Sequence, residues 1–147
     1  MNTPIGNASY WYGRYRFESC PDYMNITGDI AELKFMVLFR QKGYIVSKPM
    51  SHHSRYDFII DSGNEMKRVQ VKSTSSLLKD KNCYMCHSYT QKSKIRYSSF
   101  DIDFVAMYVD PYDAWYMIPI ESISSENIKV YPHRAYLRSK YEKYRIQ

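Results

Sequence analysis

Residues 54–73 read SRYDFIIDSGNEMKRVQVKS, and the rest of the chain is expected to fold around this stretch. Apolar and polar side chains alternate along residues 55–61 and again along residues 66–74, which is the period of a β-strand. Between the two runs, residues 62–64 are Ser-Gly-Asn, a combination that favours a tight turn. The stretch therefore predicts a β-hairpin.

A turn centred on Gly63 and Asn64 sets Asp57 directly opposite Gln70 on the paired strand. Opposed Cβ atoms lie about 4.5–5.5 Å apart, so the two side chains can share one small cation. Lys72 projects from the same face, two residues after Gln70. A carboxylate, a second oxygen ligand and a lysine together suit metal-assisted phosphodiester hydrolysis, in which a cation neutralises phosphate charge and acidifies a water molecule.

At these residues the chain resembles the PD-(D/E)xK nuclease superfamily. Tyr56-Asp57 corresponds to the "PD" pair, and Gln70-Val71-Lys72 corresponds to the "(D/E)xK" triplet. Two positions depart from the motif: Tyr56 replaces proline, and Gln70 replaces an acid, which makes it a weaker ligand for a hard cation.

Further stretches resemble the small intron-encoded homing endonucleases of this superfamily, in which a glutamine form of the motif occurs. The similar segments are Gly28-Asp29-Ile30-Ala31-Glu32, Lys42-Gly43-Tyr44, Arg68-Val69-Gln70-Val71-Lys72, Trp115-Tyr116-Met117-Ile118-Pro119 and Lys140-Tyr141-Glu142-Lys143-Tyr144. The resemblance implies a site-specific endonuclease that breaks double-stranded DNA, leaving 5′ phosphate and 3′ hydroxyl ends. It also implies Mg²⁺, with Mn²⁺ able to substitute.

The resemblance assigns a role to each site residue. Asp57, Gln70 and the carbonyl of Val71 are expected to hold the metal, Glu32 to complete the shell or orient water, and Lys72 to activate the nucleophile. Glu32 has a second interpretation, because Asp29 stands three residues before it and this spacing also fits a helix capping box.

The composition sets limits on the class of protein. With 147 residues and 44% hydrophobic content, the chain suits one domain, residues 1–147. A net charge of +6 favours a polyanionic partner such as DNA. The sequence contains no apolar run long enough for a bilayer and no signal-peptide region, so we expect no membrane association and a cytoplasmic location.

The predicted fold is α+β, with a central mixed β-sheet flanked by helices and the active site on the middle hairpin. Residues 1–25 read as an irregular basic and aromatic arm, and residues 27–42 as a helix that is apolar nearly all round and packed on more than one side. The final element is a polar helix over residues 135–145. Further strands are expected at residues 44–49, 82–90, 100–109, 114–120 and 128–131.

Polar and basic side chains near the hairpin are candidates for phosphate contacts, although a solvated charged loop is the ordinary explanation for the later ones. They are Ser54, Arg55, Ser73, Lys79, Lys81, Lys92, Lys94 and Arg96.

A second motif, Cys83-Tyr84-Met85-Cys86-His87, matches the pattern of c-type haem attachment. We expect no haem, because the segment alternates like a strand. A zinc site from Cys83, Cys86, Cys20 and a histidine stays open as an alternative, which would make this a redox or zinc protein.

Two further alternatives keep the nuclease fold. One is a Holliday-junction resolvase, which reads junction shape, and the other is a DNA-binding module that has lost catalysis, for which Gln70 is the best argument. A chain with one site needs a homo-oligomer, a dimer or a tetramer, to cut both strands.

Overall fold

The computed structural model describes residues 23–90, 93–134 and 139–146, and its main feature is a mixed six-stranded sheet. The strand order is β1-β2-β3-β6-β7-β9, in which β3 and β6 run parallel and every other neighbouring pair is antiparallel. The strands are β1 (Ile45–Ser47), β2 (Phe58–Asp61), β3 (Met66–Thr74), β6 (Phe104–Val109), β7 (Ala114–Pro119) and β9 (Arg145–Ile146). The predicted mixed sheet is confirmed.

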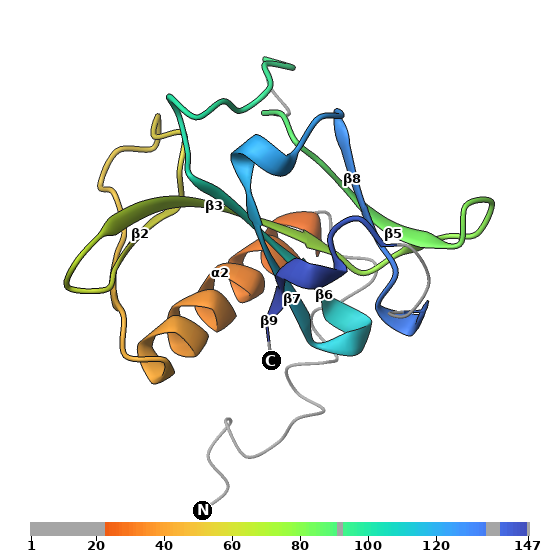
Figure 1. The fold of residues 1–147 in the computed structure, drawn as a ribbon, viewed down its shortest axis with the longest axis horizontal. Coiled ribbons are helices and arrows are strands. Elements are labelled where there is room, and N and C mark those ends of the chain that lie inside the picture. The colour runs from red at the N-terminus through yellow and green to blue at the C-terminus, as the bar shows by residue number, and fades with distance from the viewer. Residues whose placement is uncertain (1–22, 91–92, 135–138, 147) are drawn as a thin grey trace, which may run out of the picture.

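Helix α2 (Tyr23–Gln41) packs across one face of this sheet (Figure 1). Its contact stripe is Ala31, Phe35 and Phe39, spaced at four residues so that the three side chains share one side of the helix. The Phe35 ring stacks on Phe39 at 4.4 Å and on Phe58 of β2 at 5.2 Å between ring centroids. The helix is therefore fixed to the predicted hairpin by aromatic packing.

The opposite face of the sheet carries a second core under a smaller three-stranded sheet. That sheet has the order β4-β5-β8, with β4 (Leu77–Leu78), β5 (Cys83–His87) and β8 (Asn127–Val130). Both β4 and β5 lie within the long connection from β3 to its parallel neighbour β6. The crossover connection that parallel pairing requires thus contains two strands of the second sheet.

The β2–β3 hairpin has the predicted register. Phe58 pairs with Val69 and Asp61 with Met66, and the backbone N–H of Ser62 donates to the carbonyl of Glu65. Gly63 stands first in the two-residue turn with φ of 89°, a positive value that glycine adopts without steric cost.

Short 3₁₀ turns join the later strands. They are η3 (Asp110–Tyr112), η4 (Ile120–Ser122), η5 (Pro132–Arg134) and η6 (Glu142–Tyr144).

Three expectations need correction. Helix α2 already includes Tyr23, so Asp29 lies inside it and cannot cap its start. Leu33 and Val37 are 62% and 57% exposed, so within the described residues only one side of α2 is packed, because its apolar residues outnumber the positions that the sheet can cover.

The polar helix expected over residues 135–145 is wrong: residues 139–146 form a turn, the 3₁₀ helix η6 and strand β9, while residues 135–138 lie outside the described residues. Pairing of Arg145 and Ile146 with β7 outweighs helix propensity in so short a segment. The arm predicted for residues 1–25 lies almost entirely outside the described residues. Within the described ranges, no helix has the length and apolar character needed to cross a bilayer.

Candidate active site

The candidate site lies where β2 and β3 stop pairing. Strand β3 has nine residues, but β2 pairs only with its first four, from Met66 to Val69. The pairing stops at Phe58 and Val69, and the residues that precede Phe58 turn away from β3. The next residues of β3, Gln70 and Val71, therefore face the Asp57 side chain instead of a paired strand. Polar side chains from both segments can meet in the space that this divergence leaves.

Asp57 is held in that space by three hydrogen bonds to β3. Its backbone N–H donates to the carbonyl of Val69 at 2.9 Å. Its Oδ2 atom accepts from the backbone N–H of Val71 at 2.7 Å and from the side-chain amide of Gln70 at 2.6 Å. The predicted meeting of Asp57 and Gln70 across the hairpin is therefore confirmed as a contact. Among the described residues, Oδ1 of Asp57 has no hydrogen-bond partner.

The carboxyl of Asp57 is difficult to ionise in this position. Burial raises its pKa from 3.8 to about 6, against the lowering effect of the hydrogen bond from Val71. The negative charge of Glu32 raises this pKa further, while the ammonium groups of Lys72 and Lys48 lower it. A partly buried carboxyl beside a second acid is a common arrangement at functional sites.

Glu32 comes to the site from helix α2. Its Oε2 atom lies 2.5 Å from Nζ of Lys48, which follows the edge strand β1. Lys48 also lies over the ring of Phe58 at 5.5 Å from the centroid. Glu32 therefore lies close enough to Asp57 to raise its pKa, and it already has a cationic partner in Lys48.

Lys72 is the partly buried basic residue of the group. Burial lowers the pKa of its ammonium, an effect that the nearby charge of Asp57 partly opposes. Its Nζ lies 5.4 Å from the centroid of the Tyr97 ring, a cation–π distance. A lysine that gives up its proton more readily than usual can orient or deprotonate a nucleophilic water molecule.

The family assignment rests on a match along most of the chain. The family model described as PD-(D/E)XK endonuclease matches residues 24–144. The chain belongs to this family.

A solved structure, "a bacterial homing endonuclease: I-Ssp6803I", shares the fold with a TM-score of 0.63. It is 24% identical to this chain, and the match covers 72% of this chain and 76% of that one. A Holliday junction resolvase, Hjc from Archaeoglobus fulgidus, is 16% identical with a TM-score of 0.49, over 71% of this chain and 83% of that chain. No curated protein sequence matches.

Endonucleases of this family generally use a divalent metal ion, and the donor set here fits one. The unengaged Oδ1 of Asp57, the carboxylate of Glu32 and the Gln70 side-chain oxygen are hard ligands of the kind that Mg²⁺ prefers. A divalent cation also relieves the mutual repulsion of the two acids. The described residues contain no cluster of three or more His, Cys, Asp or Glu that could hold a metal, so two acids must be supplemented by amide or carbonyl oxygens.

The predicted phosphate-contacting residues differ in their exposure and in their ion pairing. Arg55 is 3.1 Å from Asp101 in an ion pair, which reduces its freedom to reach DNA. Ser54 and Ser73 are partly buried near the site strands, and Lys79 and Lys81 are exposed in the turn between β4 and β5. Lys94 and Arg96 are exposed beyond β5, and Lys92 lies outside the described residues.

Sequence reasoning overlooked Lys48 and Tyr97. Neither follows a recognisable spacing, because both reach the site through non-local packing. The only available signal was position: Lys48 lies within the strand predicted over residues 44–49, whose observed counterpart β1 ends one residue before it.

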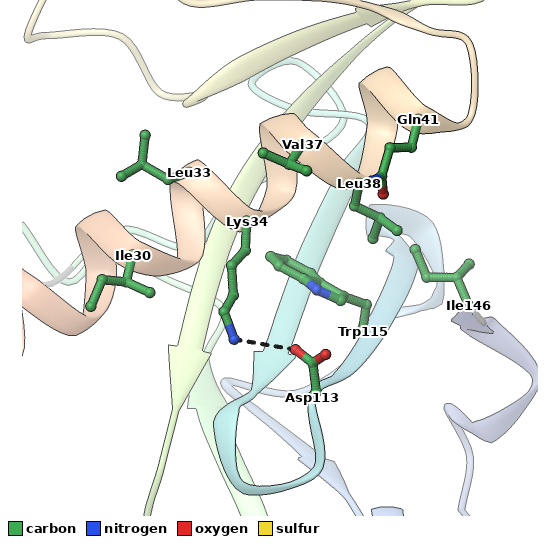
Figure 2. Close-up of a pocket in the computed structure, with 9 residues that line it drawn as sticks. All are labelled: Ile30, Leu33, Lys34, Val37, Leu38, Gln41, Asp113, Trp115 and Ile146. Atoms are coloured by element: carbon green, nitrogen blue, oxygen red, sulfur yellow. Dashed lines mark hydrogen bonds and ion pairs between the residues drawn. The ribbon is translucent and has the colours of Figure 1, made fainter.

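A groove beside α2 is distinct from the candidate site, because neither Asp57 nor Glu32 lines it. Figure 2 shows it between the outer side of the helix and β7, with Leu33 and Val37 on one wall and Trp115 opposite. Its charged groups are Lys34 and Asp113, which pair at 3.3 Å. Because its lining contains a single acid, this groove does not suit metal-assisted chemistry.

The cysteine motif forms no metal site among the described residues. Cys83 and Cys86 are free and buried on the single strand β5. Burial raises the pKa of the Cys86 thiol to about 12, which disfavours the thiolate that zinc requires. Cys20 lies outside the described residues.

Proposed function

We propose that this PD-(D/E)XK endonuclease is a site-specific, metal-dependent enzyme of the homing-endonuclease type that hydrolyses both strands of double-stranded DNA. The observation that supports it best is the meeting of Asp57 and Gln70 at the divergence of β2 from β3, with Glu32 and Lys72 on either side. The excess of positive charge, +6, supports a nucleic-acid substrate.

In this proposal each residue has a distinct task. Asp57, Gln70, Glu32 and the Val71 carbonyl hold Mg²⁺, for which Mn²⁺ can substitute. The metal, when bound, neutralises charge on the scissile phosphate and lowers the pKa of a water molecule. The backbone N–H of Val71 fixes one oxygen of Asp57, so that the other keeps its direction.

Lys72 acts on the attacking water. Its burial against Tyr97 and beside Cys86 keeps solvent away and favours the neutral amine, which can accept a proton. Removing the amine therefore removes the proton acceptor, and it also removes a positive charge that lowers the pKa of Asp57.

The test is cleavage of a library of linear duplexes and four-way junctions with Mg²⁺, comparing the wild type with Lys72→Met. Lys67→Met is the matched control, because it removes the same charge from an ion pair with Glu65 near the hairpin turn. We expect the wild type and the control to cut a few linear sequences and Lys72→Met to lose about 100-fold or more in rate.

Other results would replace the proposal. Preferential cutting of junctions would indicate a resolvase. DNA binding without cleavage by any of the three proteins would indicate a lapsed binding module.

Cutting both strands also requires more than one copy of the site. Because the described residues carry a single acid cluster of this kind, we infer that the enzyme works as a homo-oligomer, a dimer or a tetramer. Light scattering of the protein alone and on a cleavable duplex measures this directly, and a monomer on the cut duplex would refute it.

A further inference from the structure

Lys48 occupies a position that the proposed chemistry leaves unexplained. It lies just outside β1, with Nζ 2.5 Å from Oε2 of Glu32 and 5.5 Å from the centroid of the Phe58 ring. Its side chain is 58% exposed, whereas that of Glu32 is 26% exposed. The ammonium therefore lies at the opening of the site, between solvent and the acid.

The charges around the site show what this contact does. Glu32 and Asp57 carry two negative charges when ionised, and Lys48 and Lys72 carry two positive charges when protonated. Lys48 interacts electrostatically with both acids and pairs directly with Glu32 at the open side, while Lys72 is partly buried and acts on Asp57. A divalent cation that binds Glu32 must compete with this ammonium.

We propose that Lys48 couples metal binding to DNA binding: it neutralises Glu32 when the carboxylate holds no cation, and a bound cation releases its ammonium to contact a DNA phosphate beside the site. This inference rests on the proposed function, because it uses Glu32 as a metal ligand. The inference adds Lys48 as a phosphate-binding residue and makes its release from Glu32 depend on cation binding.

The side chain of Lys48 is suited to both contacts. Lysine has a flexible four-carbon stem and a compact charge that can turn from one oxygen to another. The hydrogen bond to Glu32 is the only one that the Lys48 side chain makes within the described ranges, so releasing it breaks no wider side-chain network. Because coupling between two ligands is reciprocal, DNA that engages Lys48 also frees Glu32 for the metal.

The experiment measures metal and DNA binding separately, without cleavage. Calorimetric titration with Ca²⁺ alone is compared among wild type, Lys48→Met, Lys48→Arg and the control Lys67→Met, followed by duplex binding in Ca²⁺ at several salt concentrations. The probe duplex is the sequence that the wild type cuts in Mg²⁺. The control loses one charge from an exposed ion pair, so it measures the effect of net charge alone.

We expect Lys48→Met to bind Ca²⁺ about fivefold more tightly than the control, because an exposed ion pair no longer competes. The same variant should bind the duplex more weakly in Ca²⁺, with a salt dependence that is smaller by about one phosphate contact. Lys48→Arg should resemble the wild type in both measurements, since guanidinium can pair with either oxygen.

The inference is overturned if Lys48→Met binds Ca²⁺ no more tightly than Lys67→Met, or if the two bind DNA with the same salt dependence. If that happens while the wild type still cuts DNA, the proposed function stands and only the role of Lys48 fails. A wild type that neither binds Ca²⁺ nor cuts DNA overturns both.

Discussion

Replacing Asp57 with asparagine should abolish DNA cleavage and stabilise the protein at neutral and alkaline pH. The amide has nearly the same shape, and its oxygen can still accept from the N–H of Val71 and from Gln70. What changes is the charge, since the variant no longer buries a carboxylate beside Glu32.

The expected magnitude follows from the pKa of Asp57. This carboxyl has a pKa of about 6 in the folded protein and 3.8 as its ordinary value, so the folded state holds its proton more tightly than the unfolded chain. The protonated Asp57 carboxyl thus stabilises the folded state fully below about pH 4. This stabilisation is lost as the pH rises through about 6. The full loss is on the order of 3 kcal/mol, at about 1.4 kcal/mol for each pKa unit.

The assay is urea unfolding of the wild type and Asp57→Asn in EDTA from pH 3.5 to 8.5. The difference in unfolding free energy should be small at the acid end and grow to about 3 kcal/mol in favour of the variant above pH 7. Asp80→Asn is the control, because it removes the same charge from an exposed turn. Saturating Mg²⁺ should then stabilise the wild type selectively and reduce the difference.

A difference that does not change with pH, or that favours the wild type at pH 8, would refute the reasoning. It would mean that Asp57 is better solvated than its position between Val71 and Glu32 indicates. Equal stabilisation of both proteins by Mg²⁺ would show that the metal binds elsewhere.

Three further substitutions test the supporting structure. Phe35→Ala should lower the unfolding free energy by about 3–5 kcal/mol, measured by urea denaturation, because it empties the centre of the helix–sheet core; a loss below 1 kcal/mol would contradict that packing. Gly63→Val should cost about 1–2 kcal/mol in the same assay, since a β-branched residue is strained at a φ of 89°, and an unchanged midpoint would contradict a positive φ at this position. Arg68→Leu should cost about 2 kcal/mol and speed amide exchange at residues 99–103, because Arg68 bonds Asp103 and the carbonyls of Ser99 and Phe100; unchanged exchange would show that this loop is held by other contacts.

Local patterns in the sequence predicted the hairpin well. Its register depends only on alternation and on the Gly63-Asn64 turn, so the contact of Asp57 with Gln70 follows from the amino-acid sequence alone. The edge strand β1 and the paired strands β6 and β7 also follow from local alternation.

Non-local pairing explains most of what the sequence did not predict. The sequence predicts a helix that ends at Arg145, but β7 offers Arg145 and Ile146 a strand edge. The contact of Lys48 with Glu32 joins the exit of β1 to the middle of α2, and no sequence spacing encodes such a meeting. Likewise, the exposure of Leu33 depends on how wide a stripe of α2 the sheet can cover.

The crossover between β3 and β6 has a consequence for the order of folding. Asp57 and Gln70 meet within one hairpin, so their contact can form as soon as residues 57–71 have collapsed. The surroundings of Lys72 come from Cys86 and Tyr97, and β3 gains its second neighbour only when Val69 pairs with Phe104. Closing so long a loop is slow compared with forming a hairpin. A chain still emerging from the ribosome can therefore assemble the acid and amide early, but it buries the lysine only after most of the domain has been synthesised.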